Sequence, residues 1–191
     1  MKPLSVYPKA IIALLAGATL LLHAAAATAR VEVEFVKPDN YTDAGDRHAA
    51  GSEDPKAIMQ EFERHFVKLG ETCLPAGQDL HIRVLDIRLA GRVEWWHRSL
   101  QFQDVRVLRD VTWPEMELEY VLKDAGGAEI GRAKDSLSSP MYLHDTIAQS
   151  GLESYPYEKA MMTRWFKERF CPAGAQASAP ANAPSAAPPP H

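Results

Sequence analysis

The strictest pattern in the sequence is an alternation of apolar and polar side chains over residues 115–122. Met116, Leu118, Tyr120 and Leu122 are separated by single residues, most of them glutamates. Successive side chains of a strand point to opposite faces of a sheet, so this segment predicts a strand with one buried and one solvated face. A turn sequence (DAGG) and a second β-rich segment follow, which predicts an antiparallel hairpin. The apolar face of such a sheet must be covered.

Two amphipathic segments are predicted to cover it. Asp54 followed by a proline is a typical helix start, because aspartate caps free backbone N–H groups and proline loses no hydrogen bond there. Apolar residues recur at helical spacing as far as Leu69, and Gly70 predicts the end of this helix. A second helix is predicted over residues 157–170, just before a Cys-Pro pair.

The remaining β-rich segments complete the sheet. Residues 31–36 alternate and predict the first strand, whereas residues 80–89 alternate with a slip of phase that a β-bulge near Val84 explains. Residues 92–111 are rich in β-branched and aromatic side chains and predict one or two strands. The predicted fold class is therefore α+β: a mainly antiparallel sheet of about five strands, with two helices on one face.

The N-terminus has the pattern of a cleaved signal peptide, residues 1–29. Lys2 and Lys9 precede an unbroken apolar run over residues 10–22, and a small-x-small cleavage site follows at residues 27–29. The run is too short to cross a bilayer as a helix, so no stable membrane anchor is expected after cleavage. This pattern predicts a periplasmic protein.

The C-terminal residues 173–191 are mostly alanine and proline and predict a disordered tail, which leaves a single domain over residues 30–172. The formal net charge is −4, and it becomes more negative when the signal peptide with its two lysines is removed. This balance disfavours binding to nucleic acid.

The chain has two cysteines, Cys73 and Cys171, each just past a predicted helix. In an oxidising compartment an even count favours a disulfide. If both helices cross the same face of the sheet, their C-terminal ends bring these cysteines together. Two separate buried thiols are the alternative.

One long polar loop is the best candidate for a site. Residues 37–52 include Tyr41, Thr42, Asp43, Asp46 and His48, a set able to bind a divalent cation or take part in acid–base chemistry. Aspartate and threonine in such loops more commonly bond the local backbone, and calcium-loop spacing is absent.

A second candidate binding surface is the aromatic and cationic cluster of Trp95, Trp96 and Arg98. In an extended segment adjacent side chains point to opposite faces, so one tryptophan can lie in the core while the other faces a ligand groove or a partner. The alternative is that both indoles are covered.

The sequence carries no motif of an enzyme class. Metal-binding histidine pairs, a nucleophile elbow, a phosphate loop and a dinucleotide fingerprint are all absent. We therefore predict no catalytic residue, no cofactor and no metal ligand set.

Several segments resemble a family of exported proteobacterial proteins known as domain of unknown function 3016, over most of residues 31–171. The resembling positions are Phe35, Pro38, Tyr41, Thr42 and Asp43; Leu74, Pro75, Gly77, Gln78 and Leu80; Asp86, Leu89, Ala90 and Gly91; Trp113 and Pro114; Glu158, Lys159, Trp165 and Phe166. The resemblance implies an exported single-domain protein with no assigned activity, cofactor or catalytic residue.

The expected function is that of a periplasmic, non-enzymatic binding or envelope accessory protein, whose partner is an envelope protein or a small ligand. A small periplasmic hydrolase that uses histidine with aspartate or serine is one alternative. Metal binding by Asp43, Asp46 and His48 is another.

Overall fold

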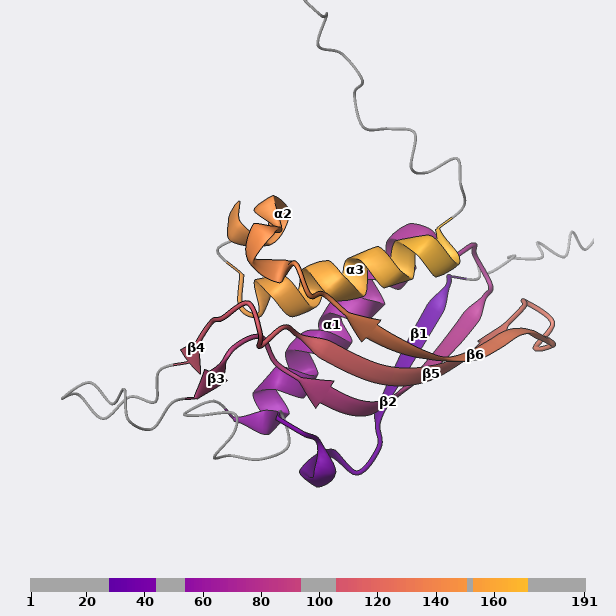
Figure 1. Ribbon diagram of the computed structural model, residues 1–191. Coiled ribbons are helices and arrows are strands. Elements are labelled where there is room, and N and C mark those ends of the chain that lie inside the picture. The colour runs from indigo at the N-terminus through magenta and orange to yellow at the C-terminus, as the bar shows by residue number, and fades with distance from the viewer. Residues whose placement is uncertain (1–27, 44–53, 94–105, 151–152, 172–191) are drawn as a thin grey trace, which may run out of the picture.

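The computed structural model describes residues 28–43, 54–93, 106–150 and 153–171 (Figure 1). The elements in chain order are β1 (Arg30–Phe35), η1 (Pro38–Asn40), α1 (Pro55–Cys73), β2 (Asp79–Arg88), β3 (Arg92–Val93), β4 (Arg106–Val107), β5 (Glu115–Lys123), β6 (Glu129–Ser138), η3 (Tyr142–His144), α2 (Thr146–Ser150) and α3 (Pro156–Phe170). The predicted signal peptide and C-terminal tail lie outside the described residues, apart from the last two positions of the former. No helix within the described ranges is long and apolar enough to span a membrane.

The predicted α+β class is confirmed, with a mixed sheet. Four strands lie in the order β1-β2-β5-β6, and β3 pairs with β4 in a small second sheet. The β2–β5 and β5–β6 pairs are antiparallel, as the hairpin prediction requires, but β1 runs parallel to β2. The crossover between these two strands passes through α1, which is the connection that parallel neighbours need. Alternation alone reports which face of a strand is buried and not its direction.

The bulge predicted near Val84 is confirmed. The register of β2 against β5 shifts between Val84 and Asp86. Because of this shift, both Val84 before it and Ile87 after it lie in the core. The segment after the bulge carries residues 89–91 to the end of the sheet that lies opposite the β5–β6 turn (Figure 1).

Helices α1 and α3 pack side by side on one face of the sheet, as predicted (Figure 1). Asp54 caps α1 by accepting a hydrogen bond from the backbone N–H of Lys56, at 3.0 Å. Phe66 of α1 meets Trp165 and Phe166 of α3 in the core, with edge-to-face and tilted ring contacts. Phe62 of α1 makes an edge-to-face contact with Tyr155, just before α3. The prediction of two helices missed the short third helix, α2.

The prediction that α1 ends at Gly70 is wrong, because the helix continues to Cys73. Gly70 lies inside the helix, where it faces β1. A Cβ atom built on it would overlap Cγ2 of Val31. The glycine therefore serves close packing of the helix on the strand, and a helical glycine of this kind cannot be told from a terminal one by local sequence.

Replacing Gly70 with alanine is expected to lower the free energy of unfolding by about 1–3 kcal/mol, because overpacking outweighs the gain in helix propensity. Urea denaturation measures this change. The double variant G70A/V31A, which removes the overlapping Cγ2 atom, should recover part of the loss. Substitution of the neighbouring exposed Glu71 with alanine serves as the control, and equal effects of G70A and E71A would contradict the packing argument.

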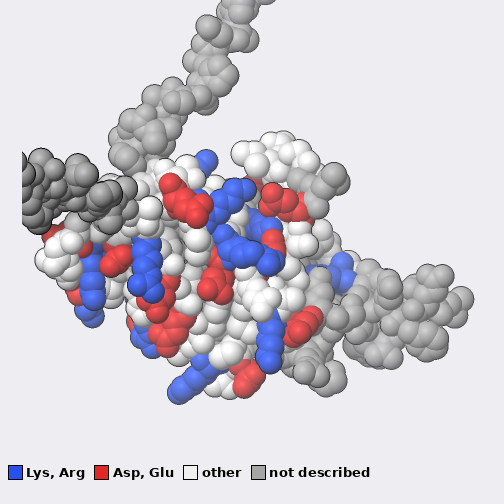
Figure 2. All heavy atoms as spheres, turned by 180° about the vertical axis from the view of Figure 1, so that it is seen from behind, with Lys and Arg blue, Asp and Glu red and all other residues white. Residues whose placement is uncertain are grey.

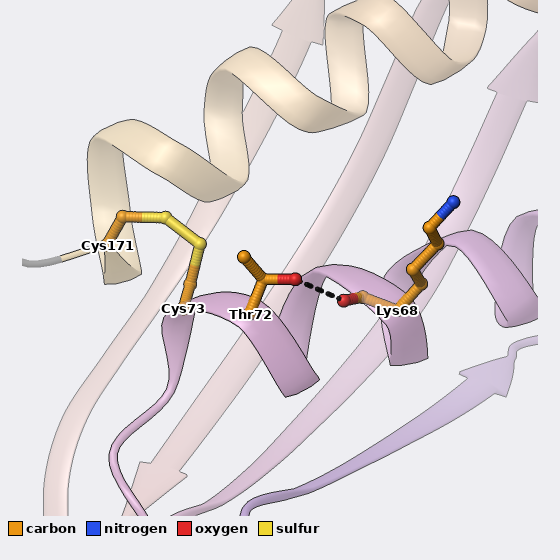
Figure 3. Close-up of a disulfide and its surroundings, with 4 residues drawn as sticks. All are labelled: Lys68, Thr72, Cys73 and Cys171. Atoms are coloured by element: carbon orange, nitrogen blue, oxygen red, sulfur yellow. Dashed lines mark hydrogen bonds between the residues drawn. A yellow bond between two sulfur atoms is a disulfide. The ribbon is translucent and has the colours of Figure 1, made fainter. Parts of the chain in front are cut away.

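The two cysteines form the predicted disulfide. Cys73 ends α1 and Cys171 follows α3, and their Cα atoms lie 4.5 Å apart across a sequence separation of 98 residues (Figure 3). Next to the bridge, the Thr72 hydroxyl donates to the carbonyl of Lys68, one turn earlier in α1. The bridge joins the C-terminal ends of the two helices that cover the sheet.

Candidate functional site

Residues 89–91, just after β2, are bound by groups from three other parts of the chain. The backbone N–H of Leu89 donates to Asp43 Oδ2 at 3.1 Å, and that of Ala90 donates to Glu158 Oε1 at 2.7 Å. The N–H of Gly91 donates to the carbonyl of Thr112 at 2.8 Å. Asp43, α3 and the segment before β5 therefore converge on this short segment.

An ion pair holds β4 against the same segment. The Arg106 guanidinium makes a bidentate contact with Asp43, and both N–O distances are 3.0 Å. It also donates to the carbonyl of Gly91 at 2.9 Å. The two side chains are only 19% and 12% exposed. Both carboxylate oxygens of Asp43 are occupied by Arg106 and by the Leu89 N–H, so Asp43 acts here as a structural group.

Gly91 allows β4 to come this close. Its φ is +78°, a left-handed conformation that favours glycine. A Cβ atom at this position would lie 2.6 Å from the carbonyl oxygen of Val107. A side chain here would therefore push β4 away and weaken the contact of Arg106 with Asp43.

Glu158 is the buried acid of this cluster, with 3% of its surface exposed. Burial raises the pKa of its carboxyl group above 4.5, and the negative charge of Asp43 acts in the same direction. The hydrogen bond from Ala90 and the charge of Arg106 oppose the rise without cancelling it. Ionisation of Glu158 would place a second carboxylate charge beside Asp43 at a buried position.

This raised pKa predicts a specific pH dependence of stability. Between pH 4.5 and the folded-state pKa the native chain binds one more proton than the unfolded chain, so the contribution of Glu158 to stability falls as pH rises. The variant E158Q, whose amide oxygen still accepts from Ala90, should therefore gain stability relative to wild type as pH increases from 4.5 to 8. Denaturant midpoints across this range measure the difference, with the exposed Glu168→Gln on the same helix as control. A constant difference across the pH range would refute the assignment.

A pocket of about 460 Å³ opens beside residues 89–91, within the usual range of small-molecule sites. We call it the strand-end pocket. Its apolar lining residues are Leu89, Val93, Val111 and Trp113, and its polar ones are Thr42, Asp43, Arg88, Arg92 and Thr112, with Gly91 contributing backbone.

One wall of the pocket is held by a single carboxylate. Glu115, the first residue of β5, accepts from Trp113 Nε1 at 2.8 Å through one oxygen and from Arg88 at 2.5 Å through the other. These two hydrogen bonds fix the orientation of the indole and of the guanidinium, because each group is bonded to a different oxygen of Glu115. Arg92, on β3, is exposed, and no described side chain pairs with it.

The structure describes three of the residues predicted for the polar loop. Tyr41 is buried and donates its hydroxyl to the carbonyl of Val84 at 2.8 Å. Thr42 donates from its backbone N–H and its hydroxyl to the two carboxylate oxygens of Asp86, both at 2.6 Å. Thr42 and Asp43 line the strand-end pocket, whereas Tyr41 does not.

The other predicted site residues lie outside the described residues: Asp46, His48, Trp95, Trp96 and Arg98. The predicted binding surface is therefore placed only in part. Within the described ranges, no group of three or more histidine, cysteine or acidic side chains is arranged to hold a metal ion.

Sequence reasoning missed the residues that complete the pocket and its support. Arg106 and Glu158 carry no signal of local periodicity, because each acts through contacts with distant segments. Arg92 carries none either, because only the fold brings it to the lining of the pocket. Glu158 and Trp113 do stand among the positions that carry the family resemblance. That resemblance was the one available signal for them.

A second polar cluster, around the buried Lys159, joins the two long helices. Its ammonium group contacts Glu61 at 2.5 Å and Glu153 at 3.2 Å. Hydrogen bonds from Lys159 and Arg64 lower the pKa of Glu61 to about 2. Burial lowers the pKa of His65, whose Nε2 lies 2.8 Å from the Thr163 hydroxyl. These groups satisfy one another and bind α1 to α3.

Charged side chains elsewhere are mixed. On the face seen in Figure 2, lysines and arginines are interspersed with aspartates and glutamates, and no large patch of one sign forms. The open face of the sheet repeats this mixture, with Arg83 of β2 paired to Glu34 of β1 and Glu119 of β5. Neither surface resembles a polyanion-binding site.

Comparison with known proteins gives one match. No curated protein and no solved structure is detectably similar to the chain. A family model described as protein of unknown function (DUF3016) matches residues 29–168, which include every described strand and nearly all of α3. The chain therefore belongs to the DUF3016 family.

Proposed function

We propose that this chain is a periplasmic, non-enzymatic binding or envelope accessory protein that acts through the strand-end pocket. The observation that carries the proposal is the construction of the pocket. Its floor, Leu89 and Gly91, belongs to a segment that is bonded to Asp43, β4, α3 and Thr112, and its wall is held by Glu115. Such rigid support is what a preorganised binding site requires.

The disulfide supports the proposed compartment. Structural disulfides persist in oxidising environments, and this one joins the two helices of the core. The apolar run and small-residue site at the N-terminus point in the same direction. The envelope is therefore the place in which we expect the pocket to meet its ligand or partner.

The compartment is tested by expressing the full chain and measuring the mass of the periplasmic product. We expect a mass that begins at Arg30, with two cysteines that are alkylated only after reduction. A product that retains residues 1–29, or that remains in the cytoplasm with free thiols, would contradict the proposed location.

Binding is tested on this product by screening small molecules for a rise in the melting temperature. A true ligand should lose its effect in the variant V111W, which fills the rim of the pocket from a side chain that is 77% exposed. The matched control is I130W, at an exposed position of β6 outside the pocket lining. If no compound binds, or if every hit is indifferent to V111W, the pocket is not the functional site.

A further inference from the structure

The strand-end pocket carries an excess of positive charge. Among the described residues that line it, Asp43 is the one acid, and both of its oxygens are already bonded to Arg106 and Leu89. Of the two lining arginines, Arg88 is paired with Glu115, while Arg92 has no partner among the described side chains. The pocket therefore presents a guanidinium that no acidic side chain of the described residues neutralises.

The rest of the lining is apolar and partly uncovered. Val111 is 77% exposed, and Trp113 beside it is only partly buried with its Nε1–H directed to Glu115. Because that donor is used, the indole ring offers a ligand its apolar ring surface and no further hydrogen bond. Val93, which follows Arg92 on β3, also lines the pocket.

We propose that the strand-end pocket binds an organic anion, a carboxylate or phosphate group carried on an apolar or aromatic body; this rests on the function proposed above. The planar guanidinium of Arg92 matches either anion with two parallel hydrogen bonds. The body of the ligand lies against Trp113 and Val111. Arg92, which no described acid neutralises, specifies the anionic group of the ligand. The exposed apolar wall of the same pocket specifies its body.

The test uses three probes that share a phenyl ring: phenylacetate, phenyl phosphate and the neutral phenylacetamide. The mature, oxidised protein is titrated at low ionic strength, where charge interactions are least screened. The reporter is the NMR signal of the Trp113 indole N–H, identified by its loss in W113F. We expect both anions to move this signal, and the amide to bind at least about tenfold more weakly, as the loss of a charge-assisted contact implies.

The role of Arg92 is tested with matched variants. R92Q should weaken phenylacetate binding about tenfold, and R92K, which keeps the charge but not the fork, should weaken it less. The control is R132Q, which makes the same change at an exposed arginine of β6. Arg132 lies opposite Val121 of β5, six residues along that strand from Glu115 at the pocket. Comparable losses in R92Q and R132Q would show a general effect of net charge and overturn the assignment.

The outcomes also separate this inference from the proposed function. If phenylacetamide binds as tightly as the anions, the pocket binds ligands but does not select for charge, and only the inference fails. If one anion alone binds, the result selects between carboxylate and phosphate within the proposal. If no probe moves the Trp113 signal, the anion proposal fails, whereas the proposed function falls only if the compound screen also finds no ligand at the pocket.

Discussion

Replacing Asp43 with alanine is expected to lower the free energy of unfolding by about 3 kcal/mol, a large effect for one loop residue. The substitution removes the bidentate contact of Asp43 with the largely buried guanidinium of Arg106, and it removes the acceptor of the Leu89 N–H. Loss of a carboxylate contact from a buried charge and an unsatisfied buried donor are both costly. Urea denaturation of the mature protein at pH 7 measures the change.

Two further variants distinguish this mechanism from a general effect of altering the loop. Asp39 lies in the same stretch of chain but is exposed, so D39A should change stability by less than about 0.5 kcal/mol. Combining D43A with R106M also removes the guanidinium that loses this contact, and the double variant should be more stable than the sum of the single effects implies. Strict additivity would mean that Asp43 and Arg106 do not act as a pair.

Loss of the Cys73–Cys171 disulfide is expected to lower the free energy of unfolding by about 4–5 kcal/mol. The bridge closes a loop with a sequence separation of 98 residues, and in the chain-entropy model a loop of that size restricts the unfolded state by this amount. The double variant C73A/C171A avoids placing a hydroxyl at the buried position of Cys73. Denaturation of the oxidised wild type, the reduced wild type and the variant measures the effect.

The reduced wild type and the alanine variant should agree within about 1 kcal/mol if chain entropy dominates. A variant much less stable than the reduced protein would instead point to lost packing at Cys73, which belongs to the hydrophobic core. If oxidation had no effect on stability, the bridge would not constrain the unfolded chain as proposed. Folding would then not depend on an oxidising compartment, and only the N-terminal pattern would support the proposed export.

These two predictions concern opposite ends of the same layer. The disulfide joins α1 and α3 where they end, whereas Asp43 and Glu158 bond to residues 89–91 at the other end of α3. We expect D43A to weaken ligand binding at the strand-end pocket as well as stability, because the floor of the pocket depends on it. Removal of the disulfide should affect stability far more than binding.

Local pattern was sufficient for most of the secondary structure. The Asp54 cap, the alternation in β1 and β5, and the phase slip at Val84 each predicted what the structure has. These signals work because the burial of one face imposes a period of two on a strand and of about 3.6 on a helix. The disulfide was favoured by the even cysteine count, and placing both helices on one face offered a way to bring the cysteines together.

Tertiary structure alone decided the direction of β1, the role of Gly70 and the support of the strand-end pocket. Gly70 has the same local surroundings as a helix terminus, and only the approach of Val31 shows why it is a glycine. Asp43 meets Arg106 across 63 residues, and Ala90 meets Glu158 across 68. Local periodicity records which face of an element is buried. It does not record which distant polar group completes a hydrogen bond, because that depends on where the folded chain brings the two segments together.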